Sequence, residues 1–156
     1  MARVEREITI DAPADRVFSY VADFTRHPEW ASQQLQIEQT SEGAVGQGAT
    51  FKSVGHQFGE KHDAITVTEY APNTSIVFEC EGNAGKIRHS FSLQEQDGST
   101  TLAKAMEPLQ TAGTFKLLAP IVMTFVTPGA MSKDLQNIKK QIEEQGSSSE
   151  APTSEG

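Results

Sequence analysis

Four histidines and a single cysteine are the side chains of this sequence best suited to proton transfer or nucleophilic attack. In "KIRHSFSLQE", the two-residue period of a strand places His89 on one face with Ile87, Phe91 and Leu93. Two interpretations of His89 stay open. It is either a core histidine satisfied by one hydrogen bond, or a cavity-wall group that orients a ligand oxygen or transfers a proton. For proton transfer, the candidate partner is the carboxylate of Glu107.

The other histidines give no catalytic or metal-binding pattern. His56 and His62 flank "QFGEK", and their spacing matches no common zinc motif. His27 precedes Pro28 and is interpreted as a solvated loop residue that helps to end a helix. We therefore expect no metal site.

The cysteine and the glycine-rich turns predict neither covalent chemistry nor a cofactor. Cys80 shares a strand face with Ile76 and Phe78 in "SIVFECEG" and is expected to act as a small buried hydrophobe. Because it is the only cysteine, an internal disulfide is excluded. "GQGATF" has Phe51 where a dinucleotide fingerprint needs a third glycine, so we expect no cofactor.

The bulk composition is that of one globular domain. The net charge is −8 and no window clusters Lys and Arg with aromatic residues, which disfavours a nucleic-acid partner. The N-terminus lacks the apolar core of a signal peptide, and the run "LLAPIVM" is too short to span a bilayer. We expect a cytoplasmic protein without membrane insertion, with a domain over residues 1–145 and a disordered tail over 146–156.

Periodicity predicts the elements that position these residues. Residues 4–10 alternate as a half-buried strand, Asp11 is a candidate helix N-cap, and Asp23 is a candidate cap for a second short helix that ends at Trp30. From residue 34 to 110 the period is two, with glycine-, asparagine- and aspartate-rich turns. Six further strands are predicted in "LQIEQT", "ATFKSV", "HDAITVTEY", "SIVFECEG", "KIRHSFSLQE" and "TTLAKAMEP".

The last part of the chain has helical periodicity in two stripes. The first stripe is Phe115, Leu118, Val122, Phe125 and Gly129, and the second is Leu135, Ile138 and Ile142. The stripes fall on nearly opposite sides of one straight helix, and Pro128 lies between them. We therefore predict two helical pieces, at about 116–127 and 130–145, with a kink near Pro128.

This order of elements and four sequence segments resemble a known family. The segments are "VEREITIDAPADRVFSYVADFTRHPEW", "GAVGQGATF", "VTEYAPNTSIVFE" and "LQEQDGSTTL". They are similar to the polyketide cyclase/dehydrase-like branch of the START-like (birch-pollen-allergen) superfamily, over about residues 4–143. The resemblance implies an α+β helix-grip fold, in which a seven-stranded antiparallel sheet wraps around the C-terminal helix. It also implies a hydrophobic cavity that the two short helices close at one end.

A cavity of this kind favours binding of a small hydrophobic molecule, which is polyketide-, lipid- or aromatic-like. The residues predicted to bind the ligand are Trp30, Phe51, Val67, Phe78, Cys80, His89, Phe91, Phe115, Leu118, Val122 and Phe125. Two alternatives stay open: a cyclase or dehydratase that uses His89 and Glu107, and a protein-interaction module. The stretch at 115–126 is apolar nearly all round, which indicates either cavity lining or a homodimer contact, so the chain is expected to be a monomer or a homodimer.

Overall fold

The sheet is the framework of the molecule. The computed structural model describes residues 3–32, 34–56 and 60–150. Its strands are β1 (Val4–Ile10), β2 (Gln34–Gln39), β3 (Thr50–His56), β4 (Glu60–Ala71), β5 (Ser75–Gly82), β6 (Gly85–Gln96) and β7 (Ser99–Thr111). They form one antiparallel sheet in the order β1-β7-β6-β5-β4-β3-β2, in which the first strand pairs with the last. The predicted seven-stranded antiparallel sheet is confirmed.

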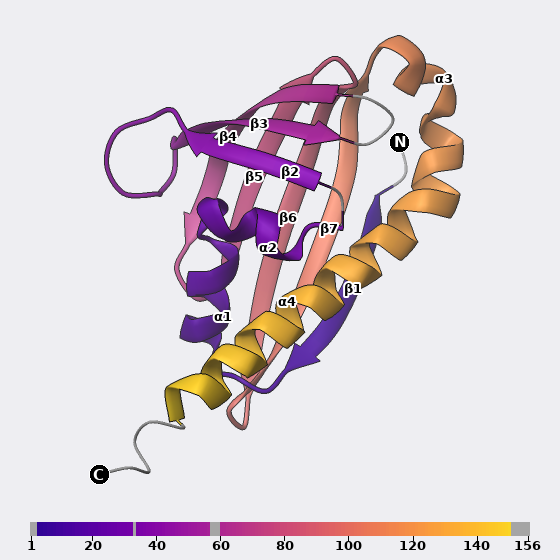
Figure 1. The fold of residues 1–156 in the computed structure, drawn as a ribbon. Helices are drawn as coiled ribbons and strands as arrows, with labels where there is room; N and C mark the ends of the chain where they lie inside the picture. The colour runs from indigo at the N-terminus through magenta and orange to yellow at the C-terminus, as the bar shows by residue number, and fades with distance from the viewer. Residues whose placement is uncertain (1–2, 33, 57–59, 151–156) are drawn as a thin grey trace.

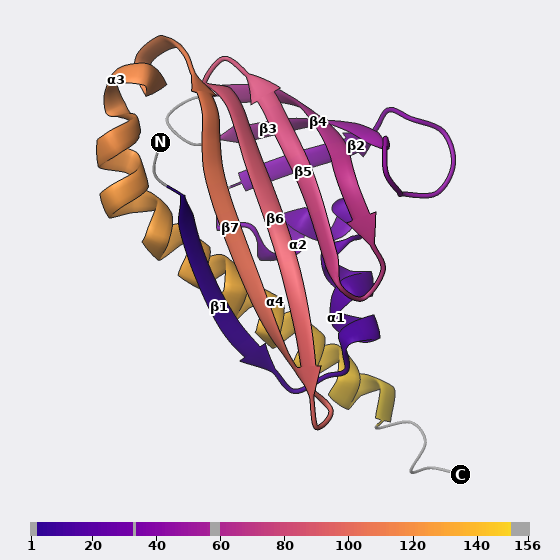
Figure 2. The ribbon, with the colours of Figure 1, turned by 180° about the vertical axis from the view of Figure 1, so that it is seen from behind.

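The helices α1, α2 and α4 lie over one face of this sheet, as the two opposite views show (Figures 1 and 2). Between β1 and β2 lie α1 (Ala14–Val21), the 3-10 turn η1 (Phe24–Arg26) and α2 (His27–Trp30), here called the N-terminal cover. The predicted pattern of helix, break and short helix ending at Trp30 is confirmed. The C-terminal helix runs diagonally across the same face.

The start of α1 differs from the sequence expectation. Asp11 does not cap the helix: Pro13 occupies the N-cap position and makes no side-chain hydrogen bond. The free N–H of Ala14 instead donates to Oε1 of Glu95 at 2.6 Å, and the N–H of Asp11 donates to Oε2 of Glu143 at 2.9 Å. Carboxylates from β6 and from the C-terminal helix therefore accept the hydrogen bonds of backbone N–H groups near the start of α1, in place of a capping side chain next to the helix.

The C-terminal helix is interrupted earlier than predicted. It consists of α3 (Gly113–Ile121), a π-helical segment at Val122–Val126 and α4 (Thr127–Glu150). The predicted kink near Pro128 is displaced by a few residues: the α-helical pattern is interrupted at Val122–Val126 and resumes at Thr127, so Pro128 and Gly129 lie in the first turn of α4. Pro128 has no N–H to donate, and the N–H of Thr127 before it bonds to the carbonyl oxygen of Val122, five residues back instead of four. The helix also continues through 146–150, where a disordered tail was expected, and 151–156 lie outside the described residues.

The core lies between the sheet, the N-terminal cover and α4. Leu135, Ile138 and Ile142 of α4 are at most 2% exposed and pack in one cluster with Phe18 and Ile10. The second predicted stripe therefore faces the sheet. Of the first stripe, Phe115, Leu118 and Val122 border a cavity, whereas Phe125 and Gly129 do not.

Candidate functional site

A cavity of about 450 Å³ lies between the sheet and the C-terminal helix. Its apolar wall includes Trp30, Leu35, Ile37, Ile65, Phe78, Ile87, Met106, Phe115, Leu118, Val122, Val126 and Met131. Its polar wall includes His27, Ser53, Lys61, Asp63, His89, Lys104 and Asp134. The size and the mostly apolar lining are those of a site for a small organic molecule.

His89 lies in this wall, on the inner face of β6. Its imidazole stacks on Phe78 of β5, with ring centroids 5.1 Å apart and planes inclined by 11°. Burial lowers the pKa of His89 well below its usual range, and the positive charge of Lys104 adds to this shift. The imidazole is therefore neutral at pH 7, with one nitrogen that donates a hydrogen bond and one that accepts.

Glu107 is not positioned to act with His89. Register pairs Glu107 with Arg88, whose side chain points to the outer face because strand neighbours alternate. There the carboxylate of Glu107 lies 3.6 Å from Nη1 of Arg88, and Nη2 of the same guanidinium lies 3.3 Å from Oε2 of Glu79. The outer face of the sheet thus holds Glu107 in a cross-strand ion-pair network, and the catalytic pair His89–Glu107 does not form.

A buried ion pair that sequence reasoning missed lies in the cavity wall instead. Lys104 is 5% exposed and Asp134 8% exposed, with Nζ 3.6 Å from Oδ2. The other carboxylate oxygen of Asp134 accepts a hydrogen bond from the N–H of Ser32 at 2.7 Å. Burial lowers the pKa of Lys104, and Asp134 opposes that shift.

Aromatic rings flank the Lys104 ammonium. Nζ lies 5.6 Å from the ring centroid of Trp30 and 5.8 Å from that of Phe91, within the range of cation–π attraction. Only one carboxylate pairs with this ammonium among the described residues, and it lies beyond ordinary hydrogen-bond length. Lys104 therefore offers the cavity charged N–H donors that lack a close acceptor in this part of the chain.

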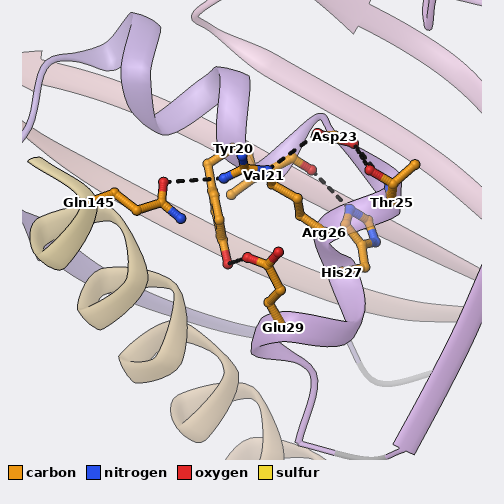
Figure 3. A network of polar contacts seen from close by, with 8 residues as sticks. All are labelled: Tyr20, Val21, Asp23, Thr25, Arg26, His27, Glu29 and Gln145. Atoms are coloured by element: carbon orange, nitrogen blue, oxygen red, sulfur yellow. Dashed lines mark hydrogen bonds and ion pairs between the residues drawn. The ribbon is translucent and has the colours of Figure 1, made fainter. Parts of the chain in front are cut away.

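His27 is buried rather than solvated, which corrects the sequence interpretation. It is 3% exposed, and its Nε2 donates to the carbonyl oxygen of Val21 at 3.0 Å (Figure 3). Its ring lies 4.4 Å from that of Phe24 and 4.7 Å from that of Trp30. Burial lowers the pKa of His27 to about 4, against the smaller opposing effect of the Val21 carbonyl.

Polar contacts hold the N-terminal cover in place around this histidine (Figure 3). Asp23 accepts a hydrogen bond from the N–H of Thr25 at 3.1 Å, so its predicted capping role is confirmed. Nη1 of Arg26 donates to Oε1 of Gln145 on α4 at 3.2 Å. Because Asn137 of α4 also donates to the carbonyl oxygen of Trp30 at 3.0 Å, the cover is tied to the helix at two points.

Trp30 lies between the N-terminal cover and the cavity. The residue is 4% exposed, and its indole Nε1–H has no hydrogen-bond acceptor among the residues that the structure describes. A buried donor without a partner costs about 1–3 kcal/mol. Trp30 belongs both to the hydrophobic core and to the cavity wall, where the sequence predicts a ligand contact.

The predicted ligand-binding residues divide into three groups. Trp30, Phe78, Cys80, His89, Phe115, Leu118 and Val122 line the cavity. Phe51, Val67 and Phe91 point inward from the sheet but are buried beneath the cavity wall, at no more than 3% exposure. Phe125 is 78% exposed and is not part of the wall, because the π-helical turn brings Val126 to the cavity in its place.

Cys80 lines the cavity but is not set up as a nucleophile. Burial raises the pKa of its thiol to about 12, and the nearby carboxylate of Asp63 adds to that shift. The thiol is therefore protonated at neutral pH and reacts poorly. Among the described residues, no group of three or more His, Cys, Asp or Glu side chains is arranged to hold a metal ion.

Comparison with protein families identifies the relatives of this chain. Residues 1–143 match the family described as "Polyketide cyclase / dehydrase and lipid transport". The chain belongs to this family. A comparison with curated proteins finds no match.

Solved structures share the fold of this family member at low sequence identity. Protein TTHA0849 from Thermus thermophilus superposes with a TM-score of 0.74 at 15% identity, covering 92% of this chain and 99% of its own. The Zhui aromatase/cyclase from Streptomyces sp. R1128 gives a TM-score of 0.71 at 17% identity, covering 91% and 93%. Protein CV1439 from Chromobacterium violaceum gives 0.69 at 13%, covering 92% and 99%. These identities establish the shared fold alone.

Proposed function

We propose that this family member binds a small hydrophobic molecule in the cavity between the sheet and the C-terminal helix. The observation that carries the proposal is a mostly apolar cavity of about 450 Å³ whose wall also holds polar and charged side chains. A preformed apolar cavity lowers the cost of ordering a bound ligand. Polyketide-, lipid- and aromatic-like molecules all fit this description.

The polar groups of the wall favour a ligand that carries an oxygen acceptor. Among the described residues, the Lys104 ammonium pairs only with Asp134, at 3.6 Å, so it has further N–H groups to donate, and neutral His89 can donate one hydrogen bond. The indole N–H of Trp30, which has no acceptor in the part of the chain that the structure describes, belongs to a residue of the same wall. A carbonyl or hydroxyl oxygen near Lys104 gains a charge-assisted hydrogen bond without disturbing the ion pair with Asp134.

A second candidate function is a cyclase or dehydratase acting on such a ligand. It is supported by a neutral histidine and a lysine–aspartate pair in one cavity wall, and by the Zhui relative, which is an aromatase/cyclase. Here His89 would move the proton, and the carboxylates that line the same cavity are those of Asp63 and Asp134 rather than Glu107. A His89→Ala variant separates the two functions: a binding protein changes only in affinity, whereas an enzyme loses turnover.

The first test is native mass spectrometry of the protein purified from its own host, followed by titration with paired ligands. Each pair consists of a hydrocarbon and the ketone of the same shape, and binding is followed by the fluorescence of Trp30, the only tryptophan. The ketone should bind about tenfold more tightly, because a hydrogen bond to a charged group is worth about 1.5–3 kcal/mol. In Lys104→Met/Asp134→Asn, which leaves no lone charge, this preference should disappear.

A filled cavity supplies the matched control. Val122 lines the cavity, whereas the exposed Thr124 of the same helical segment does not. Val122→Phe should weaken binding of every ligand at least about tenfold, since the added ring occupies the space of the ligand. Thr124→Phe should bind as the wild type does. If no ligand binds, or if Val122→Phe binds normally, the cavity is not a ligand site.

A further inference from the structure

Two lysine–aspartate pairs lie in the cavity wall, and they differ in their access to water. The side chains of Lys104 and Asp134 are 7% and 11% exposed, whereas those of Lys61 and Asp63 are 35% and 13% exposed. A hydrated lysine keeps its proton and is a poor nucleophile, whereas an amine surrounded by apolar groups loses its proton more readily. Of the two lysines, Lys104 is therefore the one placed where an amine can attack a ligand.

Asp134 is positioned to take the proton that Lys104 must lose. Its Oδ2 lies 3.6 Å from Nζ, a distance that a small rotation of the flexible lysine side chain closes. Transfer of one proton converts the buried ion pair into a neutral amine and a neutral carboxyl group, which removes the desolvation cost of two charges. Burial, which lowers the pKa of Lys104, acts in favour of this transfer, and the negative charge of Asp134 acts against it.

The surroundings of Nζ also suit the cation that an attack on a carbonyl group produces. The rings of Trp30 and Phe91, with centroids 5.6 and 5.8 Å from Nζ, attract any cation at this position. A protonated imine carries the same single positive charge as the ammonium and lies beside the same carboxylate of Asp134. The site therefore holds one positive and one negative charge both before and after the reaction, so the reaction adds no desolvation cost.

We propose that Lys104 captures an aldehyde or ketone ligand of the cavity as an imine, with Asp134 as the proton carrier. The inference rests on the proposed binding of a hydrophobic molecule, and it names the reactive group of that molecule. Capture of this kind is covalent but reversible, and it activates the carbon next to the imine for bond formation.

The reaction needs no group beyond these two side chains and the ligand. Lys104 first passes one proton to Asp134. The lone pair of the amine then forms the C–N bond, the electron pair of the C=O bond moves onto oxygen, and a second proton passes from nitrogen to that oxygen. Asp134 returns its proton to the resulting hydroxyl group, the C–O bond breaks and water leaves, while the lone pair of nitrogen forms the C=N bond.

Binding and capture are measured separately. The probe is naphthaldehyde, and methylnaphthalene has a similar shape but no carbonyl group. The fluorescence of Trp30, the only tryptophan, follows the binding of both molecules. Capture is followed with sodium cyanoborohydride, which reduces an imine to a stable secondary amine and so leaves the probe attached to the lysine that reacted.

The experiment is reductive trapping of the full-length protein at neutral pH, followed by peptide mapping with mass spectrometry. Lys104 should carry at least about tenfold more label than Lys61 or any other lysine, because the cavity holds the carbonyl group beside its amine. Excess methylnaphthalene should lower the labelling of Lys104, since both molecules occupy the same cavity, and should leave the labelling of exposed lysines unchanged.

Variants separate capture from binding. Lys104→Arg keeps a positive charge beside Asp134 but forms no imine, so it should bind naphthaldehyde and give no cavity adduct. Lys104→Met/Asp134→Asn should likewise bind the probe without an adduct, and it replaces Lys104→Arg where urea denaturation shows that the larger guanidinium disturbs folding. The matched control is Lys52→Arg at an exposed position of β3, which should be labelled at Lys104 as the wild type is.

Two results would overturn the proposal. In the first, Trp30 fluorescence reports binding of naphthaldehyde, but Lys104 is labelled no more than Lys61. The protein then binds the carbonyl compound without capturing it, and the proposed function stands while the imine does not. In the second, neither naphthaldehyde nor methylnaphthalene binds, and the proposed function and the capture by Lys104 are then both wrong.

Discussion

The cavity is bordered by two helical regions that are built in opposite ways. The N-terminal cover buries its aromatic side chains and satisfies most of its polar groups with short-range hydrogen bonds and ties to α4. The helical stretch at 115–126 leaves large side chains in solvent and contains a proline and a π-helical turn. One region is a fixed wall, and the other is a weakly anchored border through which a ligand can pass.

The packing of Phe24 explains the stiffness of the wall. This side chain is 1% exposed, stacks on Phe51 of β3 with ring centroids 4.2 Å apart, and meets Phe78 edge-to-face at 5.0 Å. Each of these contacts joins the N-terminal cover to a different strand of the sheet. In contrast, Leu117 is 81% exposed and has little packing to lose.

The largest expected effect is the difference in stability between these two regions. Phe24→Ala should lower the free energy of unfolding by about 3–5 kcal/mol, because it leaves a cavity in a packed aromatic cluster. Leu117→Ala should change it by no more than about 0.5 kcal/mol. Urea denaturation of both variants measures the difference. Equal losses would mean that the stretch at 115–126 is as firmly packed as the cover.

The second expected effect is a dependence of protein stability on pH that originates in His27 of the N-terminal cover. The pKa of His27 is about 4 in the folded protein and 6.5 when exposed, so below pH 6.5 the unfolded chain takes up a proton that the folded protein excludes. The contribution of neutral His27 to the free energy of unfolding is complete above pH 6.5. It is lost as the pH falls to 4, which lowers the free energy of unfolding by about 3 kcal/mol. The pKa of His89 is also lowered, so His89 likewise makes the folded protein less stable as the pH falls.

Urea denaturation at a series of pH values between about 4 and 7 checks this expectation. His27→Phe should reduce the slope of stability against pH, with loss of the hydrogen bond to Val21. The matched control is His62→Phe at an exposed position of β4, which should keep the wild-type slope. A slope that is unchanged in His27→Phe would mean that His27 is already accessible to protons in the folded protein.

The sequence predicted the sheet and the cover because their signals are local. Strand alternation, hairpin turns and the capping residue Asp23 each act within a few residues, and the structure contains all three. The position of the helix interruption was predicted only approximately, near Pro128, and it lies at Val122–Val126. Proline signals an irregularity in the preceding turn, but the sequence does not say that this irregularity is a π-helical turn.

The candidate site was predicted less well, because its groups meet only through strand register. Alternation alone left two choices for the face of β7 that carries Lys104, and only the pairing of His89 with Met106 turns Lys104 inward and Glu107 outward. His27 was assigned to solvent from its proline neighbour. The signal that could have corrected this was its position between Phe24 and Trp30, a spacing that places three rings together in a short helix.

The smallest expected effect tests whether Gly129 is a hinge of the weakly anchored border. Gly129 is exposed in α4, and a Cβ atom added there would meet no atom within 4 Å. Gly129→Ala should therefore raise the free energy of unfolding by about 0.5–1 kcal/mol, since alanine loses less backbone freedom in a helix. Gly82→Ala is the matched contrast, because there a Cβ would overlap Oδ1 of Asp63 and lie 2.5 Å from the carbonyl oxygen of His62.

Gly82→Ala should destabilise the protein in the same denaturation experiment, because the backbone of β4 cannot move aside without disturbing the sheet. Ligand uptake by Gly129→Ala decides what the glycine does. Uptake at the wild-type rate places the passage at the π-helical segment and Pro120, where the helix is already irregular. Slower uptake in a more stable protein would place the hinge at Gly129 itself, because the added side chain restricts the backbone without filling the cavity.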